Sequence, residues 1–136
     1  MIRGVSVPVA GPVLLWRLLG ANMQSTADQA FTKMFPGTAY LVSDIVAVRR
    51  SGGTTVACAG GVCDAAAKGG NAIVAAGQSW LNLSAANKIV KATLAAIAGT
   101  DAFVAATAFL SLTTGSTAAA TADLYIFGYN ADAGAF

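Results

Sequence analysis

The sequence predicts a single all-β domain, built as a sandwich or a barrel. Three observations lead to this fold class: the apolar runs are short, they are rich in β-branched residues, and Gly-rich turns separate them. The runs recur at a spacing of about 8–12 residues, which is typical of β-sandwiches and barrels. A length of 136 residues fits one domain with its own core. We expect an extended N-terminal arm over residues 1–12 and the β-sandwich domain over residues 13–136.

The first elements follow from the positions of proline and glycine. Pro8 and Pro12 give the arm its extended character, because proline disfavours strand pairing except at a sheet edge. The apolar run of residues 13–19 is bounded by proline and glycine and predicts a short buried strand. Residues 20–38 are expected to form a loop, with room for a single helical turn around residues 26–30.

Residues 40–49 form the clearest strand, because this run is rich in β-branched residues and alternates along its length. A turn at residues 51–53 and a return strand over residues 54–59 complete a predicted hairpin. The glycine pair at residues 60–61 marks a further turn or a bulge. Strict alternation in the first strand places Tyr40, Val42, Asp44, Val46 and Val48 on one face, and Leu41, Ser43, Ile45, Ala47 and Arg49 on the other.

The second half of the chain is divided into short segments by glycine and small polar residues. Residues 84–98 are ambiguous, because alanine, leucine and lysine favour a helix whereas isoleucine, valine and threonine favour a strand. The short, turn-bounded neighbours tilt this segment toward a strand. The other strands are expected at residues 62–67, 73–76, 79–83, 103–107, 109–113 and 122–128, with a break at residues 68–71 and a loop at residues 114–120.

The composition indicates a surface made largely of small, uncharged residues. Hydrophobic residues make up 56% of the chain, mostly through alanine, and charged residues only 10%. A soluble domain is about 25% charged, so we expect partners to cover much of this surface. The net charge of +2 comes from basic residues that are not clustered, which argues against nucleic-acid binding. The basic pair Arg49-Arg50 is expected at a solvated strand end.

A secretory signal and a membrane span are both disfavoured. The N-terminal segment has an early arginine and an apolar stretch, but Pro8, Pro12 and Arg17 interrupt the helix that a signal sequence would form. The sequence offers no run of the ~18 uninterrupted apolar residues that a spanning helix needs. We therefore expect no membrane partner.

Histidine and glutamate, two residue types that often act as general acids and bases in enzymes, are missing from the sequence. It contains no histidine, and its six acidic residues are all aspartates without the spacing of a catalytic pair or a calcium loop. We therefore predict that the protein is not an enzyme and has no catalytic residue, metal site or cofactor. Cys58 and Cys63 lack the further ligands of a zinc site. We expect two partly buried thiols, with a disulfide only in an oxidising compartment.

The tripeptide Thr-Ala-Asp occurs twice, at residues 26–28 and at residues 121–123. Aspartate and threonine side chains bond nearby backbone donors and therefore favour caps and turns. We expect Asp28 to shape the loop after the first strand and Asp123 to start the last strand. Both roles are structural rather than chemical.

Four segments carry a resemblance to a known group of proteins: LLGANMQSTADQAF, YLVSDIVAVRRSGGT, AAKGGNAIVAAGQSW and FLSLTTGSTAAATADLYIFG. They resemble small virion proteins of tailed bacteriophages, the capsid decoration or cement proteins. The resemblance covers about residues 14–130 and leaves the N-terminal arm outside. It implies a jelly-roll-like β-sandwich and a non-enzymatic role on the outer surface of the phage head. The implied partners are the major capsid protein and further copies of the chain, as a trimer or a dimer, made in the cytoplasm of the host bacterium.

The partner interface is expected in the arm and in the loop of residues 20–38. Extended arms and strand edges can add strands to a partner's sheet. The candidate interface residues are Ile2, Arg3, Val5, Val7, Pro8, Met23, Phe31 and Phe35. The resemblance itself transfers no catalytic, metal or cofactor residue.

Two other functions stay open. The first is another virion component, such as a head fibre base or a tail protein, which the copy number per virion would distinguish. The second is a small carbohydrate-binding β-sandwich. Aromatic residues form only 8% of the chain and serve more often in cores and interfaces. Those available for stacking on sugars are Trp16, Tyr40, Trp80, Tyr125 and Tyr129.

Overall fold

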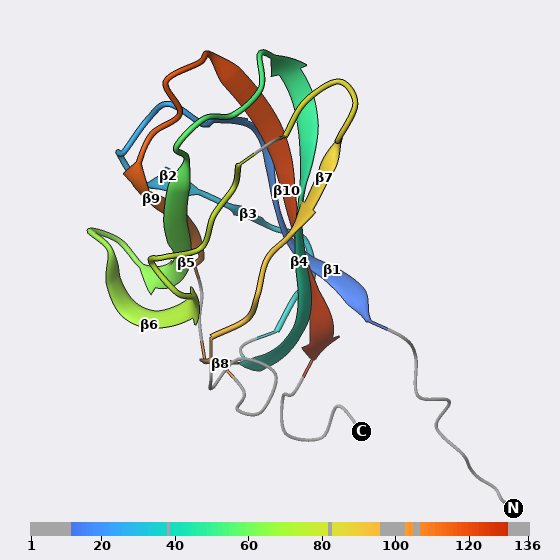
Figure 1. Cartoon of the computed structure of the whole chain (residues 1–136). Coiled ribbons are helices and arrows are strands. Elements are labelled where there is room, and N and C mark those ends of the chain that lie inside the picture. Colours follow the sequence, from blue (N-terminus) through green and yellow to red (C-terminus); the bar gives the residue numbers. More distant parts are fainter. Residues whose placement is uncertain (1–11, 38, 82, 96–102, 105–106, 131–136) are drawn as a thin grey trace, which may run out of the picture.

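The computed structural model describes residues 12–37, 39–81, 83–95, 103–104 and 107–130, and these residues contain strands but no helix. The strands form two antiparallel sheets that pack face to face. Figure 1 shows the smaller sheet, with β5, β6 and β9, on the left and the larger sheet, with β1, β4, β7 and β10, on the right. The predicted all-β sandwich is therefore confirmed.

The larger sheet has six strands in the order β3-β1-β10-β4-β7, with β8 also paired to β4. Its strands are β1 (Val13–Asn22), β3 (Thr32–Lys33), β4 (Ala39–Gly52), β7 (Ile89–Lys91), β8 (Phe103–Val104) and β10 (Ala120–Asn130). The smaller sheet has four strands in the order β2-β9-β5-β6. Its strands are β2 (Gln29–Ala30), β5 (Ala59–Ala65), β6 (Gly69–Val74) and β9 (Phe109–Thr114).

The strand pairing has the nested pattern of a jelly roll. When the short strands β3 and β8 are set aside, β1 pairs with β10, β2 with β9, β4 with β7, and β5 with β6. The chain therefore follows the path of one long hairpin that is wrapped over itself into two sheets, which is the arrangement of a double-sheet jelly roll. The jelly-roll-like fold expected from the resemblance agrees with this topology.

The hydrophobic core lies between the two sheets and follows the period of two residues along each strand. In β10 every second residue from Ala120 to Gly128 is buried. Trp16 and Tyr40 meet edge to face in this core, with ring centroids 4.7 Å apart. A fully buried side chain of this kind contributes about 1.5–3 kcal/mol. The largest buried side chains are Leu15, Trp16, Met23, Tyr40, Ile45, Ile73, Trp80, Leu83, Leu110, Leu112, Leu124 and Ile126.

The strict alternation predicted for residues 40–49 is wrong because β4 contains a bulge. Val42 pairs with Gly128 and Asp44 with Phe127, so Ser43 is an extra residue on β4. The bulge exchanges the two faces of the strand. Two residues before it and two after it therefore share the buried face: Tyr40, Val42, Ile45 and Ala47.

The predicted hairpin between residues 40–49 and 54–59 is also wrong. After β4 the chain crosses to the smaller sheet, where β5 pairs with β6 and β9. The crossing segment is held by Thr55, whose buried hydroxyl donates to the Trp80 carbonyl at 2.6 Å and accepts the Leu83 N–H at 3.0 Å. The described residues of this range, 79–81 and 83, are consequently a loop with one isolated bridge, from Ala59 to Ser79, and not the predicted strand. The glycine pair at residues 60–61 was expected to form a turn or a bulge, and a register shift of β5 lies there, between Ala59 and Gly60.

The loop with a helical turn predicted over residues 20–38 is wrong in part, because β1 continues to Asn22 and the short strands β2 and β3 follow. A bulge between Leu18 and Ala21 carries the strand past Gly20. Gly20 adopts a φ of 67°, which glycine accepts without strain. The glycine therefore bends β1 rather than ending it.

The remaining predictions agree with the structure to different extents. The ambiguous segment of residues 84–98 contains the strand β7, and its described part has no helix. Strand β10 extends the predicted strand of residues 122–128 at both ends. Residues 1–11 lie outside the described residues, and so does nearly all of the expected arm.

Candidate functional site

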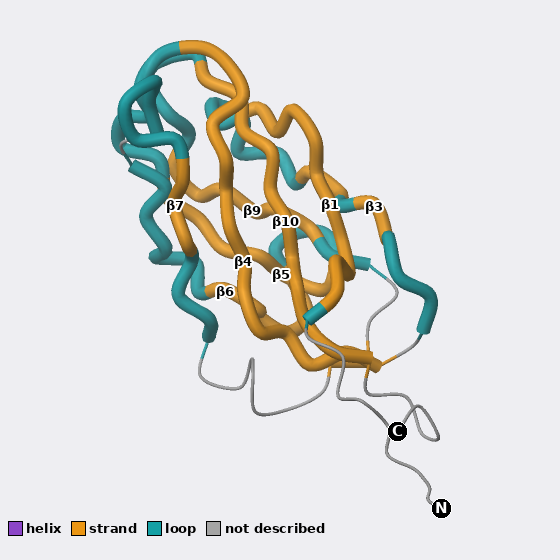
Figure 2. The backbone as a smooth tube through the Cα atoms, turned by 90° about the vertical axis from the view of Figure 1, so that its right-hand side faces the viewer, coloured by secondary structure: helices purple, strands orange, loops and turns teal. Residues whose placement is uncertain are grey.

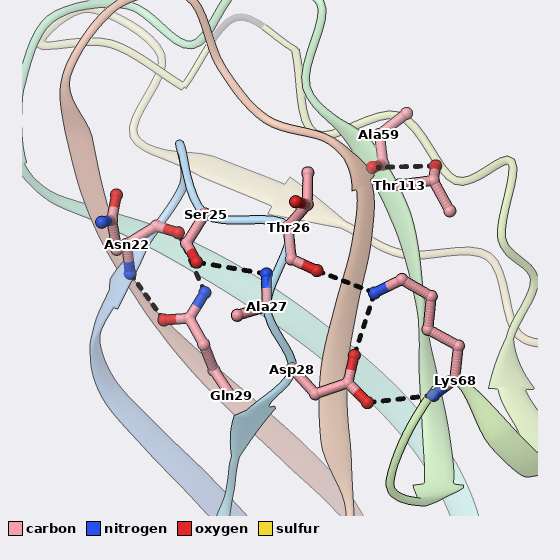
Figure 3. Close-up of polar contacts among 9 residues, drawn as sticks. All are labelled: Asn22, Ser25, Thr26, Ala27, Asp28, Gln29, Ala59, Lys68 and Thr113. Atoms are coloured by element: carbon pink, nitrogen blue, oxygen red, sulfur yellow. Dashed lines mark hydrogen bonds and ion pairs between the residues drawn. The ribbon is translucent and has the colours of Figure 1, made fainter.

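Asp28 and Lys68 tie two loops together across the smaller sheet (Figure 3). Asp28 precedes β2, and Lys68 lies in the turn between β5 and β6. The Lys68 ammonium lies 3.0 Å from Oδ1 of Asp28, and the Lys68 backbone N–H donates to Oδ2 at 3.0 Å. The ammonium also donates to the Thr26 carbonyl at 2.8 Å. Because β9 lies between β2 and β5 in this sheet, the connection spans β9.

The charge of Asp28 is stabilised in this position. Burial alone would raise the pKa of the carboxyl, but the hydrogen bonds from the backbone and the ammonium of Lys68 outweigh it. The pKa of Asp28 therefore lies below its ordinary value of 3.8. A carboxylate held in its charged form by a lysine serves as a cross-link between two loops.

Asp123 is a second cross-link, in the larger sheet. Its Oδ1 accepts the Gly20 N–H at 2.8 Å and pairs with the Arg50 guanidinium at 3.0 Å. Asp123 lies inside β10 and not at its start, which corrects the expected position. The partners are also distant rather than local, since Gly20 is 103 positions from Asp123 and Lys68 is 40 positions from Asp28.

The two cysteines are free thiols in different environments. Cys58 is fully buried, and its Sγ donates to the Met23 carbonyl at 3.5 Å. Burial raises the pKa of the Cys58 thiol to about 11. Cys63 is half-buried. The prediction of two partly buried thiols holds for Cys63, whereas Cys58 belongs to the core.

The predicted interface residues fall into two groups. Ile2, Arg3, Val5, Val7 and Pro8 lie outside the described residues. Met23 is 0% exposed and Phe31 is 7% exposed, so both side chains pack inside this chain. Phe35 is half-buried and packs against the core. A partner bound to the surface of this fold would not reach Met23 or Phe31, and we leave them out of the surface considered below.

The aromatic residues considered for sugar stacking are also divided by the fold. Trp16, Tyr40 and Trp80 are fully buried and present no ring face to a ligand. Tyr125 and Tyr129 lie on the other side of β10 from the core and are half-buried. Stacking on a sugar is therefore restricted to the side of the larger sheet that points away from the smaller sheet.

That side of the larger sheet is the most extensive apolar surface that the strand register produces, and Figure 2 looks onto it. We call it the outer face. Tyr125 and Phe127 form its centre, with ring centroids 6.3 Å apart. It also carries an ion pair, at 2.8 Å, between Lys91 on the edge strand β7 and Asp44, which lies beside Phe127. The outer face comprises Leu14, Arg17, Leu41, Asp44, Val46, Val48, Ile89, Lys91, Asp123, Tyr125, Phe127 and Tyr129.

The sequence reasoning did not identify the outer face as a site. The signal was present as the alternation of β10, in which Tyr125, Phe127 and Tyr129 occupy every second position.

Lys91 holds the pKa of Asp44 below its ordinary value by a hydrogen bond that outweighs partial burial. The charges of Asp44 and Lys91 therefore already compensate each other.

Two kinds of feature are absent from the described residues. They contain no group of three or more histidine, cysteine or acidic side chains that could hold a metal ion. They also contain no helix that is long and apolar enough to cross a membrane.

No protein-family model, no curated protein and no solved structure matches this chain. Its function is therefore inferred from the fold and the surface.

Proposed function

We propose that this protein is a structural virion protein, a decoration or cement protein that binds the outer surface of a tailed-phage head. In this role it stabilises the contacts between neighbouring major capsid subunits and performs no catalysis. The observation that carries the proposal is the nested jelly-roll pairing of the strands, a topology that recurs in viral capsid proteins. The resemblance of the four sequence segments to decoration proteins points to the same role.

The surface composition supports an assembly protein rather than a free monomer. Only 10% of the residues are charged, and six of these charged residues neutralise one another in the ion pairs that Lys68, Arg50 and Lys91 make with aspartates. Weak surface charge favours association over solubility. Such a surface is compatible with a protein that is packed between capsid subunits and its own copies, as a trimer or a dimer.

The experiment mixes the purified protein with intact heads that lack it and counts bound copies by quantitative gel and electron microscopy. We expect saturable binding in many symmetric positions. Heads that already carry the protein are the control and should bind no further copies. Binding of a few copies at one vertex would instead indicate a head fibre base or a tail component. No binding would refute the virion role on the head.

A carbohydrate-binding module is the second candidate, because jelly rolls also occur in lectins. Tyr125 and Tyr129 on the outer face are the described aromatic residues that favour it. This function would be supported over the first if immobilised polysaccharide retained the wild-type protein but not the variant Tyr125→Ala.

A further inference from the structure

The outer face has the composition of a protein interface. Tyr125 lies between Arg17 of β1 and Val46 of β4 in the register of the sheet, and Phe127 lies between Leu14 of β1 and Asp44 of β4. Tyrosine, phenylalanine and arginine are enriched at the centre of protein interfaces, and tyrosine and arginine dominate their hot spots. Ile89, at the β7 border, is 58% exposed. An apolar face with these residue types is more typical of a covered surface than of a solvated one.

The size of this face fits part of an interface. Neighbouring strands lie about 4.8 Å apart and residues along a strand about 3.4 Å apart. Across the three long strands β1, β10 and β4 and along β10 from Thr121 to Tyr129, these spacings give a footprint of roughly 14 by 27 Å, about 400 Å². The short strands β3 and β7 widen it only locally. A standard interface buries about 800 Å² on each partner. The outer face therefore supplies about half of one such interface.

Three charged residues lie on or beside the central strand β10: Asp123 on β10 itself, Asp44 beside Phe127, and Arg17 beside Tyr125. Asp44 and Asp123 are both in ion pairs, whereas Arg17 makes none within the described residues. The cations at the borders differ from it, since Lys91 is paired with Asp44 and Arg50 with Asp123. A half-buried guanidinium that is covered by a partner requires a carboxylate, which it binds through two parallel hydrogen bonds. The occupant of the outer face should therefore bring a free carboxylate.

The described part of a second copy is a poor source of that carboxylate, and Asp101 and Asp132 lie outside the described residues. Each aspartate in the described residues already has a partner: Asp28 with Lys68, Asp44 with Lys91, Asp64 with Asn71, and Asp123 with Arg50. Moving any of them to Arg17 would break an existing contact. Among the described residues, the charge balance therefore favours a different protein.

We propose that the outer face is a docking surface for a second protein that places a carboxylate, within an apolar patch, on Arg17. This inference rests on the function proposed above, in which that second protein is the major capsid subunit. The aromatic rings of β10 supply the contact area, and Arg17 fixes the orientation and selects an acidic partner.

The test compares three variants in the head-binding assay, each of which lowers the net charge by one. Arg17→Gln and Ile89→Glu change the outer face, and Thr113→Glu changes an exposed position of the smaller sheet. We expect the first two to weaken binding by about tenfold or more, and Thr113→Glu to bind as the wild type does. Ile89 is largely exposed, so Ile89→Glu keeps the test valid even if Arg17→Gln does not fold.

The possible outcomes are distinct. If the wild type binds heads and the two outer-face variants bind equally well, the docking surface is refuted while the cement role stands. If the wild type does not bind heads, the cement role is refuted and the docking proposal with it. If the variants keep head binding but lose self-association in sedimentation, or lose only polysaccharide binding, the outer face belongs to a second copy or to a glycan, and the proposal is overturned.

Discussion

The ammonium of Lys68 lies 3.0 Å from Oδ1 of Asp28, and this ion pair spans the central strand β9 from one loop to the other. The same lysine donates its backbone N–H to Oδ2 of Asp28 at 3.0 Å. The side chains of Lys68 and Asp28 are 39% and 14% exposed. This pair is therefore the least solvated of the described ion pairs.

Replacing Asp28 with asparagine should lower the stability at neutral pH and abolish part of its acid dependence. The folded-state pKa of Asp28 lies below its ordinary value of 3.8, so the unfolded chain binds more protons in the acid range. The contribution of Asp28 is therefore present above about pH 4 and is lost as the pH falls through the folded-state pKa. We expect a loss of about 1 kcal/mol at pH 7, measured by urea unfolding.

Asp44→Asn is the matched control for this measurement. The pKa of Asp44 is also lowered, by its hydrogen bond to Lys91, but the side chains of this pair are 36% and 67% exposed. Solvent screening should reduce its contribution to less than about 0.5 kcal/mol. Equal losses for the two variants, or a loss in Asp28→Asn that persists at low pH, would contradict the account of the Asp28 ion pair.

The turn between β5 and β6 should be open to stabilisation at Ala67. Ala67 and Lys68 have φ values of 58° and 57°, and the Gly69 N–H donates to the Ala66 carbonyl at 3.1 Å. Positive φ at both central residues is the pattern of a type I′ turn, which favours asparagine or glycine. Ala67→Asn should raise the free energy of unfolding by about 0.5–1 kcal/mol. Ala66→Asn should give no such gain, and a gain equal to that at Ala67 would refute the φ argument.

The two buried tryptophans should respond differently to replacement by phenylalanine. The indole N–H of Trp80 donates to the Gly60 carbonyl at 3.0 Å, whereas the indole N–H of Trp16 has no hydrogen-bond acceptor among the described residues. Trp80→Phe leaves a buried carbonyl unpaired, so it should cost about 1 kcal/mol more than Trp16→Phe. Thermal or urea unfolding of the two variants measures the difference, and a larger loss at Trp16 would be the opposite result.

The thiols should react with a thiol reagent in two separate steps. Cys58 is fully buried and its pKa is raised to about 11, so very little thiolate is available in the native protein. Cys63 is half-buried and should react first. A time course with an aromatic disulfide reagent, without and with denaturant, tests this order. Simultaneous reaction of both thiols in the native protein would mean that Cys58 is accessible.

Removing residues 1–12 should weaken binding to heads and leave the folded core intact. The described strand pairing begins at Val13, after this segment, and the core residues Leu15 and Trp16 follow it in β1. The measurement combines the head-binding assay with the thermal midpoint of the truncated protein. Unchanged occupancy on heads would exclude the N-terminal segment from the interface.

The sequence pattern predicted well the elements that are decided locally. The run from Ala120 to Asn130 alternates between core and surface residues, so β10 could be recognised from the sequence pattern alone. The bulge at Ser43 could not be recognised, because it depends on how Phe127 and Gly128 pair across the sheet. The return strand after Gly52 was assigned to the wrong sheet for a similar reason: a turn signal does not specify which sheet the chain enters next.

The candidate sites show the same division. The carboxylates of Asp28 and Asp123 were expected to act locally, but their partners come from distant strands and turns that only the jelly-roll pairing brings close. The outer face requires the register of β1, β10 and β4 before Arg17 can be placed beside Tyr125. Burial of Met23 and Phe31 likewise depends on the packing of the two sheets.

The most direct measurement is a cryo-electron microscopy reconstruction of heads saturated with the wild-type protein. We expect density for the jelly roll at symmetric positions on the outside of the shell, with the outer face of the larger sheet, around Arg17 and Tyr125, against the capsid subunits. Symmetric density in which the outer face points to solvent would contradict the docking surface. Density at a single vertex, or none, would contradict the cement role itself.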